Sequence, residues 1–574
     1  MSDPGGNVVT LDNFATLMPK LDAFDPKPLY ALVDMGSNGI RFSISDLSPP
    51  RSRLLNCVYR ERAGISLFDA LHESRSDAQE FHFSEITIQR VAQTLQRFRT
   101  ICDGYGVPEK NIAVFATEAM RTAKNRDRML FAIKEASGLA VDILSPSMES
   151  LFGAMGARSG FDHVDGLFMD LGGGSVQMTY INSLAEEQYD ILAAEAAKSL
   201  PFGAAKLTLA MSSQDDGHAA KVELRAGMKK TFDDTTARFP KLKEQAEHED
   251  GITIYFCGGG FRGYGSMLMY TDPLQPYPIP TIGGYTVPGK RFIKWREMLH
   301  ANSYDDSKIF GLSKRRREQF PAIAAVVEAL VEAVPKVKKV VFCSGGNREG
   351  VLYMKLPIHV RETNPLTLLP RVVESRATGV IDAITATISS ALTERCPAIF
   401  TKDMLRYFAA YTWHEMGDSN GTNSSKSLHA PIVGSLAGLP GMTHQIRAVL
   451  ALTMCARWGN DLGPGDKRLA DNLQALIGDE LSWWCRYIGA IARTLTIVMP
   501  APPTSEVDLH KHILLEPRIS HGLGKKGHKV GIRLKIKLHL LASGCLTTGD
   551  IESVFDKIGK GLKSDWKVEA EVTN

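Results

Sequence analysis

The chain has 574 residues, of which 44% are hydrophobic and 23% charged, a composition typical of globular proteins that contain several domains. Its formal net charge of +3 gives no indication of direct nucleic-acid binding, and no segment approaches the roughly 18 to 20 continuous apolar residues needed for membrane insertion. Residues 1–14 lack a secretory signal, and the eight cysteines are scattered without a C-x-x-C pair, which favours reduced thiols over disulfides or a zinc site. We therefore expect a cytoplasmic protein.

The first part of the chain has the pattern of an α/β protein. Residues 1–27 are polar and show no clear period, so we expect a flexible leader. From residue 28 to about residue 360, short apolar runs alternate with longer amphipathic stretches. Ser84 can cap a helix that extends to Cys102, because apolar residues recur there at steps of three and four. The run Asn111–Ala116 then predicts a buried strand.

The texture changes after the proline-containing stretch at residues 361–370. Residues 371–500 are rich in alanine and leucine at helical spacing, which predicts an all-α domain over 361–500. A second proline-rich stretch, at residues 500–503, precedes a smaller and more β-prone region. We therefore predict a small α+β C-terminal domain over residues 501–574.

One motif occurs twice in the α/β part. Leu29–Phe42 (LYALVDMGSNGIRF) is an apolar strand that ends in Asp34, followed by a turn of small residues and a second apolar strand. Gly166–Tyr180 (GLFMDLGGGSVQMTY) repeats this order around Asp170. One copy would indicate an ordinary hairpin, whereas two copies in like contexts indicate two related lobes that face each other across a cleft.

Such turns are suited to phosphate. Backbone N–H groups without neighbouring side chains bind phosphate oxygens, and an aspartate at the end of each strand can hold Mg²⁺ directly or through its water shell. We therefore predict a phosphate site between a first lobe over residues 28–158 and a second over 159–360. Glycine turns with one arginine each follow two further strands, at Thr253–Gly265 and Lys339–Tyr353. For each of these arginines, a phosphate-binding and a structural role both stay open.

Seven segments, in order, resemble the exopolyphosphatase / guanosine pentaphosphate phosphohydrolase (Ppx/GppA) family of the actin–Hsp70–sugar kinase superfamily. They are Asp34–Phe42, Ala116–Asn125, Ile143–Ser150, Asp170–Gln177, Ser199–Leu207, Phe256–Gly260 and Ser344–Tyr353. The resemblance implies a two-lobed, actin-like (ribonuclease H-like) α/β core. With the long C-terminal region, it is nearest to a fungal branch that relays mitochondrial status to nuclear genes.

The resemblance also implies a site. In the family, a water attacks the terminal phosphorus of a phosphate chain, with a divalent metal and a glutamate base. Glu149 matches that base, and Arg121 matches an arginine suited to polyphosphate charge. Asp34 and Asp170 match the metal-side acids, with Mg²⁺ as the implied metal and no organic cofactor. The implied phosphate-binding residues are Gly36, Ser37, Asn38, Gly39, Gly172, Gly173, Gly174, Ser175, Gly258, Gly259, Gly260 and Arg262.

Several residues depart from the family pattern. Gln177 stands where the family commonly has an acid, and Met148 precedes Glu149 in place of a second acid. Pro146 replaces a favoured glycine, and Gly39 replaces a hydroxyl-bearing residue. The loss of an acid weakens metal binding without removing the backbone amides that bind phosphate. The departures therefore favour a sensor with slow or lost turnover.

Two later segments have alternative interpretations. The segment Tyr411–Asp418 resembles the H-D element of metal-dependent phosphohydrolase domains, with His414 and Glu415 in its place, and His429 follows. Because no histidine precedes this element in the helical region, we predict a degenerate, structural copy rather than a metal site. The basic segment Lys525–Lys537 predicts the solvated face of a small sheet; docking of an acidic partner or of polyphosphate is the alternative.

The sequence leaves rival functions open. The first is a regulatory protein of mitochondria-to-nucleus retrograde signalling, which binds ATP, polyphosphate or a guanosine polyphosphate in the cleft and switches protein partners as the lobes close. The second is an active Mg²⁺-dependent phosphoanhydride hydrolase with Glu149 as general base. A kinase is a weaker third, because nothing resembles a sugar-binding site. The resemblance also implies a homodimer. We favour binding over catalysis.

Overall fold

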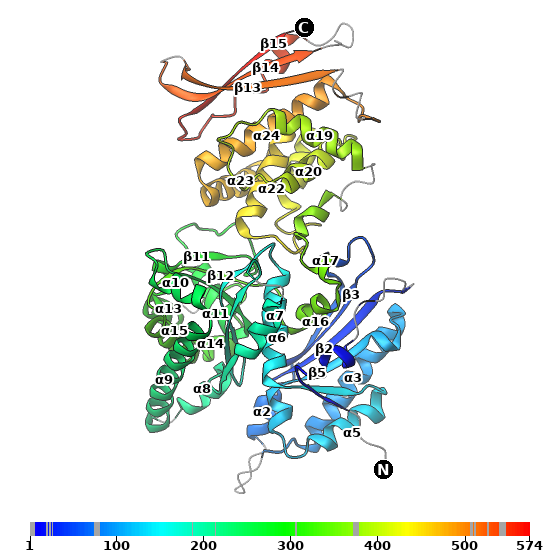
Figure 1. Ribbon diagram of the computed structural model, residues 1–574, viewed down its shortest axis with the longest axis vertical. Helices are drawn as coiled ribbons and strands as arrows, with labels where there is room; N and C mark the ends of the chain where they lie inside the picture. The colour runs from blue at the N-terminus through cyan, green and yellow to red at the C-terminus, as the bar shows by residue number, and fades with distance from the viewer. Residues whose placement is uncertain are drawn as a thin grey trace. The chain divides into compact units, whose positions relative to one another are not determined.

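The chain forms two compact units. One contains residues 1–272 and 281–364, and the other contains residues 273–280 and 365–574. The predicted boundary at residue 361 lies close to the observed one. A computed structural model (Figure 1) describes residues 6–18, 21, 25, 27–73, 81–185, 188–212, 214–304, 307–370, 378–505, 509, 512–524, 527–538 and 547–573. In these ranges no helix has the length and apolarity to cross a membrane.

The first lobe of the first unit is built on a six-stranded mixed sheet of order β1-β6-β5-β2-β3-β4. Strands β2, β3 and β4 are antiparallel neighbours, whereas β2, β5, β6 and β1 run parallel. Strand β2 is buried over six consecutive residues, as expected for a strand covered on both faces. The strands are β1 (Val8–Val9), β2 (Leu29–Gly36), β3 (Gly39–Asp46), β4 (Asn56–Ala63), β5 (Ile112–Ala116) and β6 (Val141–Leu144).

The second lobe repeats this topology. In its sheet, of order β11-β12-β10-β7-β8-β9, the strands β7, β8 and β9 are antiparallel and β7, β10 and β12 parallel. Only the edge strand β11 differs, since it runs antiparallel to β12. The repeat confirms the predicted two-lobed, ribonuclease H-like α/β core. The strands are β7 (Asp165–Leu171), β8 (Val176–Asn182), β9 (Lys198–Leu200), β10 (Ile252–Cys257), β11 (Thr286–Pro288) and β12 (Val337–Phe342).

Helices α6 (Pro146–Ser159) and α16 (Asn347–Lys355) pack against each other between the two sheets (Figure 1). Their close approach requires glycine, because a Cβ atom on Gly156 would clash with the carbonyl group of Gly346. A Cβ atom on Gly350 would likewise clash with the carbonyl group of Phe152. The pair therefore joins the two lobes through direct backbone contact.

The remaining helices of this unit cover the sheets. In the first lobe, α3 (Glu85–Tyr105) begins as predicted at Ser84, whose Oγ accepts a hydrogen bond from the Thr87 N–H at 3.2 Å. The others are α1 (Phe14–Leu17), α2 (Leu67–Glu73), α4 (Glu118–Thr122), α5 (Arg126–Ser137), α7 (Tyr189–Ala196), α8 (Ala204–Ala210), α9 (Gln214–Arg238), α10 (Pro240–Glu247), α11 (Gly258–Tyr270), α12 (Gly289–Phe292), α13 (Trp295–Tyr304), α14 (Lys314–Glu318), α15 (Phe320–Ala333) and α17 (Ile358–Arg361).

The expected flexible leader over residues 1–27 is wrong for its central part. Val8 and Val9 form β1, which pairs in parallel with β6, and the Val9 side chain is fully buried. Val8 and Val9 are ordered because they add to the open edge of a sheet. Two valines between polar residues do not by themselves indicate such a strand. Residues 1–5, 19, 20, 22–24 and 26 lie outside the described residues.

The second unit combines helices and a small sheet of order β13-β14-β15. Strands β13 and β14 are antiparallel, and β15 is parallel to β14. The elements are α19 (Thr378–Ser390), α20 (Lys402–Tyr411), α21 (Asn420–His429), α22 (His444–Arg457), α23 (Pro464–Ile477), α24 (Asp479–Val498), α26 (Thr548–Glu552), β13 (Ile513–Leu523), β14 (Lys529–Leu538) and β15 (Trp566–Thr573).

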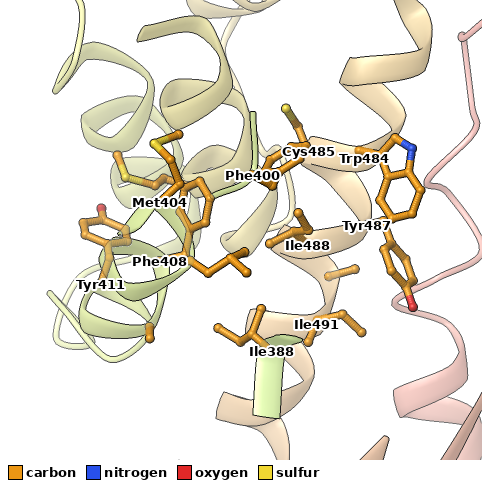
Figure 2. Packing of buried hydrophobic residues seen from close by; sticks show 14 of the residues in the cluster. Ile388, Phe400, Met404, Phe408, Tyr411, Trp484, Cys485, Tyr487, Ile488 and Ile491 are labelled. Atoms are coloured by element: carbon orange, nitrogen blue, oxygen red, sulfur yellow. The ribbon is translucent and has the colours of Figure 1, made fainter. Parts of the chain in front are cut away.

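The helices and the small sheet of this unit share one hydrophobic core, and Figure 2 shows part of its helical side. Trp483 and Trp484 of α24 are fully buried, and their rings lie 5.3 and 5.2 Å from the ring of Trp566 on β15. The two tryptophans are therefore part of the hydrophobic core of this unit. Because helices and sheet belong to one cluster, the division expected at residue 501 does not separate two cores.

The outer face of β14 carries paired charges. Ile532, Leu534 and Ile536 are buried, whereas Arg533 and Lys537 lie on the other face, 3.7 Å from Glu569 and 2.6 Å from Glu516. These ion pairs support the solvated-face interpretation over docking of an acidic partner. The predicted basic segment begins with Lys525 and Lys526, which lie outside the described residues.

Candidate functional site

The two predicted turns meet in one cleft of the first unit. The β2–β3 turn contributes Ser37 and Asn38, and the β7–β8 turn contributes residues 172–175. The cleft has a volume of about 1000 Å³, its open mouth included. Fifteen of the sixteen predicted site residues line it: Asp34, Gly36, Ser37, Asn38, Gly39, Glu149, Asp170, Gly172, Gly173, Gly174, Ser175, Gly258, Gly259, Gly260 and Arg262.

The glycines of the second turn let the two lobes approach each other. A Cβ atom on Gly173 would lie only 2.7 Å from Asn38 Nδ2 in the first lobe. A Cβ atom on Gly174 would clash with the carboxylate of Glu118, also in the first lobe. Side chains at these positions would therefore force the turns apart as well as cover their amides.

The third predicted glycine run is the start of a helix rather than a turn alone. Gly258, Gly259 and Gly260 form the first turn of α11, whose N–H groups have no partners within the helix. Gly258 has a φ of 81°, and a Cβ atom there would clash with the carboxylate of Asp170. The run therefore brings backbone donors next to one of the predicted metal-side acids.

Three carboxylates reach the cleft from separate elements. Asp34 lies near the end of β2 with 6% exposure, and its Oδ1 has no hydrogen-bond partner among the described residues. Burial raises the pKa of Asp34, and the charge of Arg41 opposes this rise. Burial likewise raises the pKa of Asp170 to about 6, against the charges of Arg262 and Arg41, while Asp34 adds to the rise.

Glu149 lies in the first turn of α6 and is held by Arg121. Arg121 Nη2 donates to Glu149 Oε2 at 2.9 Å, and Nη1 donates to the Leu144 carbonyl at 2.6 Å. Burial raises the pKa of Glu149 to about 7 in spite of this ion pair. Arg121, the sixteenth predicted residue, thus lies behind Glu149 and is not among the residues that line the cleft.

Gln177 occupies the position of the acid that the family pattern contains. Its side chain is 4% exposed, and its Nε2 donates to Ser175 Oγ at 2.7 Å. The amide is neutral and is engaged within the β7–β8 hairpin. This position therefore supplies hydrogen bonding to the turn but no charge for a cation.

Four arginines that the sequence-based assignment missed also line the cleft: Arg41, Arg62, Arg315 and Arg316. Burial, and then the charges of Arg262, Arg41 and Arg62, lower the pKa of Arg316 to about 10. Arg262 itself donates to the carbonyls of Ser344 and Gly345 at 2.9 and 2.7 Å. Guanidinium groups of like charge thus converge on one cavity. Arg41 belongs to the first motif and could have been found there.

The acids fit a small hard cation. In the described ranges, no group of three or more His, Cys, Asp or Glu side chains could hold a metal ion. Mg²⁺ needs fewer protein ligands, because it keeps several waters and binds substrate phosphates. Such an ion would give the unpartnered Oδ1 of Asp34 a ligand-binding role and would reduce the repulsion between Asp34 and Asp170. These two residues fit Mg²⁺.

The predicted degenerate element in the helical region makes local polar contacts. His414 Nε2 lies 4.0 Å from Glu415 Oε1, and His429 Nε2 lies 2.8 Å from Asp466 Oδ1. Lys426 lies 3.5 Å from Glu415. The histidines are thus paired with different acids, which supports a structural role.

Comparison with known proteins places the chain in a family. The model of the Ppx/GppA phosphatase family matches residues 47–359, more than half of the chain. The chain belongs to the Ppx/GppA phosphatase family. The model of the RTG2 C-terminal domain matches residues 368–572. The resemblance stated from the motifs is therefore confirmed.

Individual relatives agree with this family. The chain is 32% identical to Retrograde regulation protein 2 of Saccharomyces cerevisiae over 82% of this chain and 81% of the relative. It is 26% identical to Exopolyphosphatase 1 of Mycobacterium leprae over 57% of this chain and 88% of the relative. It is also similar to a solved exopolyphosphatase from Cytophaga hutchinsonii, with 19% identity, a TM-score of 0.43, and coverage of 58% of this chain and 99% of that one.

Proposed function

We propose that this member of the Ppx/GppA family is a regulatory protein that binds an inorganic phosphate chain in the interlobe cleft. The observation that carries the proposal is the make-up of the cleft wall. Five arginines and three glycine-rich segments converge there, and among the described residues that line it none is aromatic or aliphatic. Arginines and backbone amides recognise phosphate oxygens.

The same wall discriminates between the candidate ligands. A purine base gains affinity by stacking on aromatic side chains or packing on apolar ones. The cleft offers phosphate contacts without such a surface. This favours inorganic polyphosphate over ATP or a guanosine polyphosphate.

Two observations support a regulatory role: the site has one acid fewer than the family pattern, and the chain is similar to a regulatory protein. Gln177 is neutral, so the metal side of the site carries one charge fewer than the family pattern. The extensive identity with Retrograde regulation protein 2 supports a role in retrograde signalling. Closure of the lobes around the bound phosphate would then change which protein partners this protein binds.

Hydrolysis is the second candidate, and one observation favours it. The raised pKa of Glu149, about 7, would make this carboxylate an effective general base near neutral pH. Asp34 and Asp170 would hold Mg²⁺, which would neutralise charge on the phosphates. Arg121 would then orient the carboxylate of Glu149.

Binding and turnover can be tested with one set of variants. Long-chain polyphosphate should raise the melting temperature of the wild type and of Glu149→Ala, and ATP should raise it less. Gly173→Val should lose the effect, because its side chain fills the approach to the turn. Gly104→Val is the matched control, since a Cβ atom there meets open space in the first lobe.

Three results decide the outcome. Equal stabilisation by ATP, or full stabilisation of Gly173→Val by polyphosphate, would contradict the proposed ligand and site. Phosphate release that depends on Glu149 would make the protein a hydrolase.

A further inference from the structure

One side chain of the second lobe fastens the first phosphate turn. Arg315, on α14, directs its Nη2 to Asn38 Oδ1 and Ser66 Oγ, each at 2.9 Å, and to Asp69 Oδ2 at 2.8 Å. These three partners belong to the first lobe. Arg315 also lines the cleft, so the contact crosses between the lobes at the wall of the site.

The partners of Arg315 form one unit with the turn. Ser66 Oγ donates to the Ser37 carbonyl at 3.2 Å and accepts from the Asp69 N–H at 3.2 Å. The Phe68 N–H donates to the same Ser37 carbonyl at 3.0 Å. The start of α2 and the turn at residues 37–38 are thus tied together. A displacement of Asp69 or Asn38 would therefore also move the backbone amides of the β2–β3 turn, which we propose bind the phosphate chain.

We propose that Arg315 and Asp69 form a clasp that holds the lobes closed over a bound phosphate chain and slows its release. The inference rests on the proposed function, since it concerns the same cleft. Arg315 acts here as a positioning residue: it joins α14 to the first phosphate turn, and the turn contacts the ligand.

The pair is strong enough to bias closure and weak enough to open. The side chains of Arg315 and Asp69 are 36% and 41% exposed, and ion pairs of such exposure contribute modestly to stability. A ligand can therefore enter as the pair breaks, and the pair re-forms once the lobes close.

For Asp69→Asn, the clasp predicts a change in the release rate of polyphosphate that is opposite to the change expected from charge alone. Asp69→Asn removes a negative charge near an anion site, so unaided charge balance would tighten the binding of polyphosphate and slow its release. If the ion pair with Asp69 keeps Arg315 in place, Asp69→Asn releases polyphosphate faster than the wild type does. Arg315→Ala alone would not separate these ideas, because it also removes a positive charge from the cleft.

The test measures the dissociation rate of long-chain inorganic polyphosphate from the full-length protein. Asp69→Asn should release it up to about fivefold faster, the range of a partly exposed ion pair. The double variant with Arg315→Ala should release it no faster than Arg315→Ala alone. Glu318→Gln, which removes one exposed negative charge from the same helix as Arg315, is the charge-matched control and should not speed the release. Slower or unaltered release from Asp69→Asn would overturn the clasp.

A second readout needs no ligand and separates this inference from the proposed function. If polyphosphate does not bind the wild type, the proposed function fails. Hydrogen exchange of the ligand-free protein then tests the contact between Arg315 and the first lobe independently of any ligand. Arg315→Ala should speed exchange in residues 66–73 of the opposite lobe relative to Lys314→Ala, which removes an exposed charge from the same helix. Equal exchange in the two variants would refute a contact that holds the lobes together.

Discussion

Glu149→Gln should stabilise the protein in a pH-dependent way. Burial raises the pKa of Glu149 from its ordinary value of 4.5 to about 7, and its side chain is only 16% exposed. Between these pH values the folded state keeps a proton that the unfolded state has lost. The stabilisation by the protonated carboxyl is therefore full below about pH 4.5 and is lost as the pH rises through about 7.

The magnitude follows from this difference. A pKa raised from 4.5 to about 7 corresponds to a free-energy difference of about 3 kcal/mol between the two protonation states. Glutamine mimics the neutral acid and can still accept from Arg121 Nη2. The free energy of unfolding of Glu149→Gln should thus match that of the wild type near pH 4.5 and exceed it by up to about 3 kcal/mol near pH 8.

Urea unfolding at a series of pH values measures this difference. Circular dichroism is the suitable signal, because five of the six tryptophans lie in the second unit and fluorescence would report that unit. Glu135→Gln, on the exposed face of α5, provides the matched substitution against which the variant is compared. A difference between Glu149→Gln and the wild type that does not change with pH would refute the raised pKa and remove the support for a general base.

Three further predictions concern the metal side and the join between the lobes. Gln177→Glu should restore an acid beside the β7–β8 turn and raise the affinity for Mg²⁺ in calorimetry with polyphosphate; an unchanged affinity would contradict our account of the weakened metal side. Asp34→Asn should abolish any rise in melting temperature that Mg²⁺ causes in the wild type, because it removes a buried carboxylate oxygen that has no other partner; a rise that persists would exclude Asp34 as a ligand. Gly156→Ala should lower the free energy of unfolding by about 2 kcal/mol or more, since the methyl group meets the backbone of Gly346, just before α16. Gly104→Ala, in open space, should have no such cost in the same urea titration.

Local signals were enough to predict much of the fold. The cap at Ser84, the apolar runs of β2 and β7 and the glycine turns are each encoded within a few residues. The repeated motif then fixed the pairing of two similar lobes, because like sequences in like contexts form like sheets. Strand β1 escaped prediction because its two residues are ordered by an edge that lies far along the chain.

The charged wall of the site could be predicted only in part. Arg315 and Arg316 belong to a basic run that looks like an exposed helix surface, and only the packing of α14 brings them to the cleft. Arg121 was expected to face phosphate, yet its guanidinium group pairs with Glu149 and the Leu144 carbonyl. Such assignments depend on tertiary placement, whereas the backbone amides of a glycine turn are available wherever the turn lies.

Removal of metal should distinguish a binding protein from a hydrolase. Phosphate chains must be neutralised to enter a cleft, either by cations that the protein holds or by its own side chains. Here the guanidinium groups of five arginines line the cleft, while Asp34, Asp170 and Glu149 have raised pKa values and Gln177 adds no charge. The arginines can neutralise phosphate without a metal ion, so polyphosphate should still bind in the presence of EDTA. Loss of binding in EDTA, restored by Mg²⁺, would mean that the acids and their metal ion govern the site, and a catalytic function would then be the better conclusion.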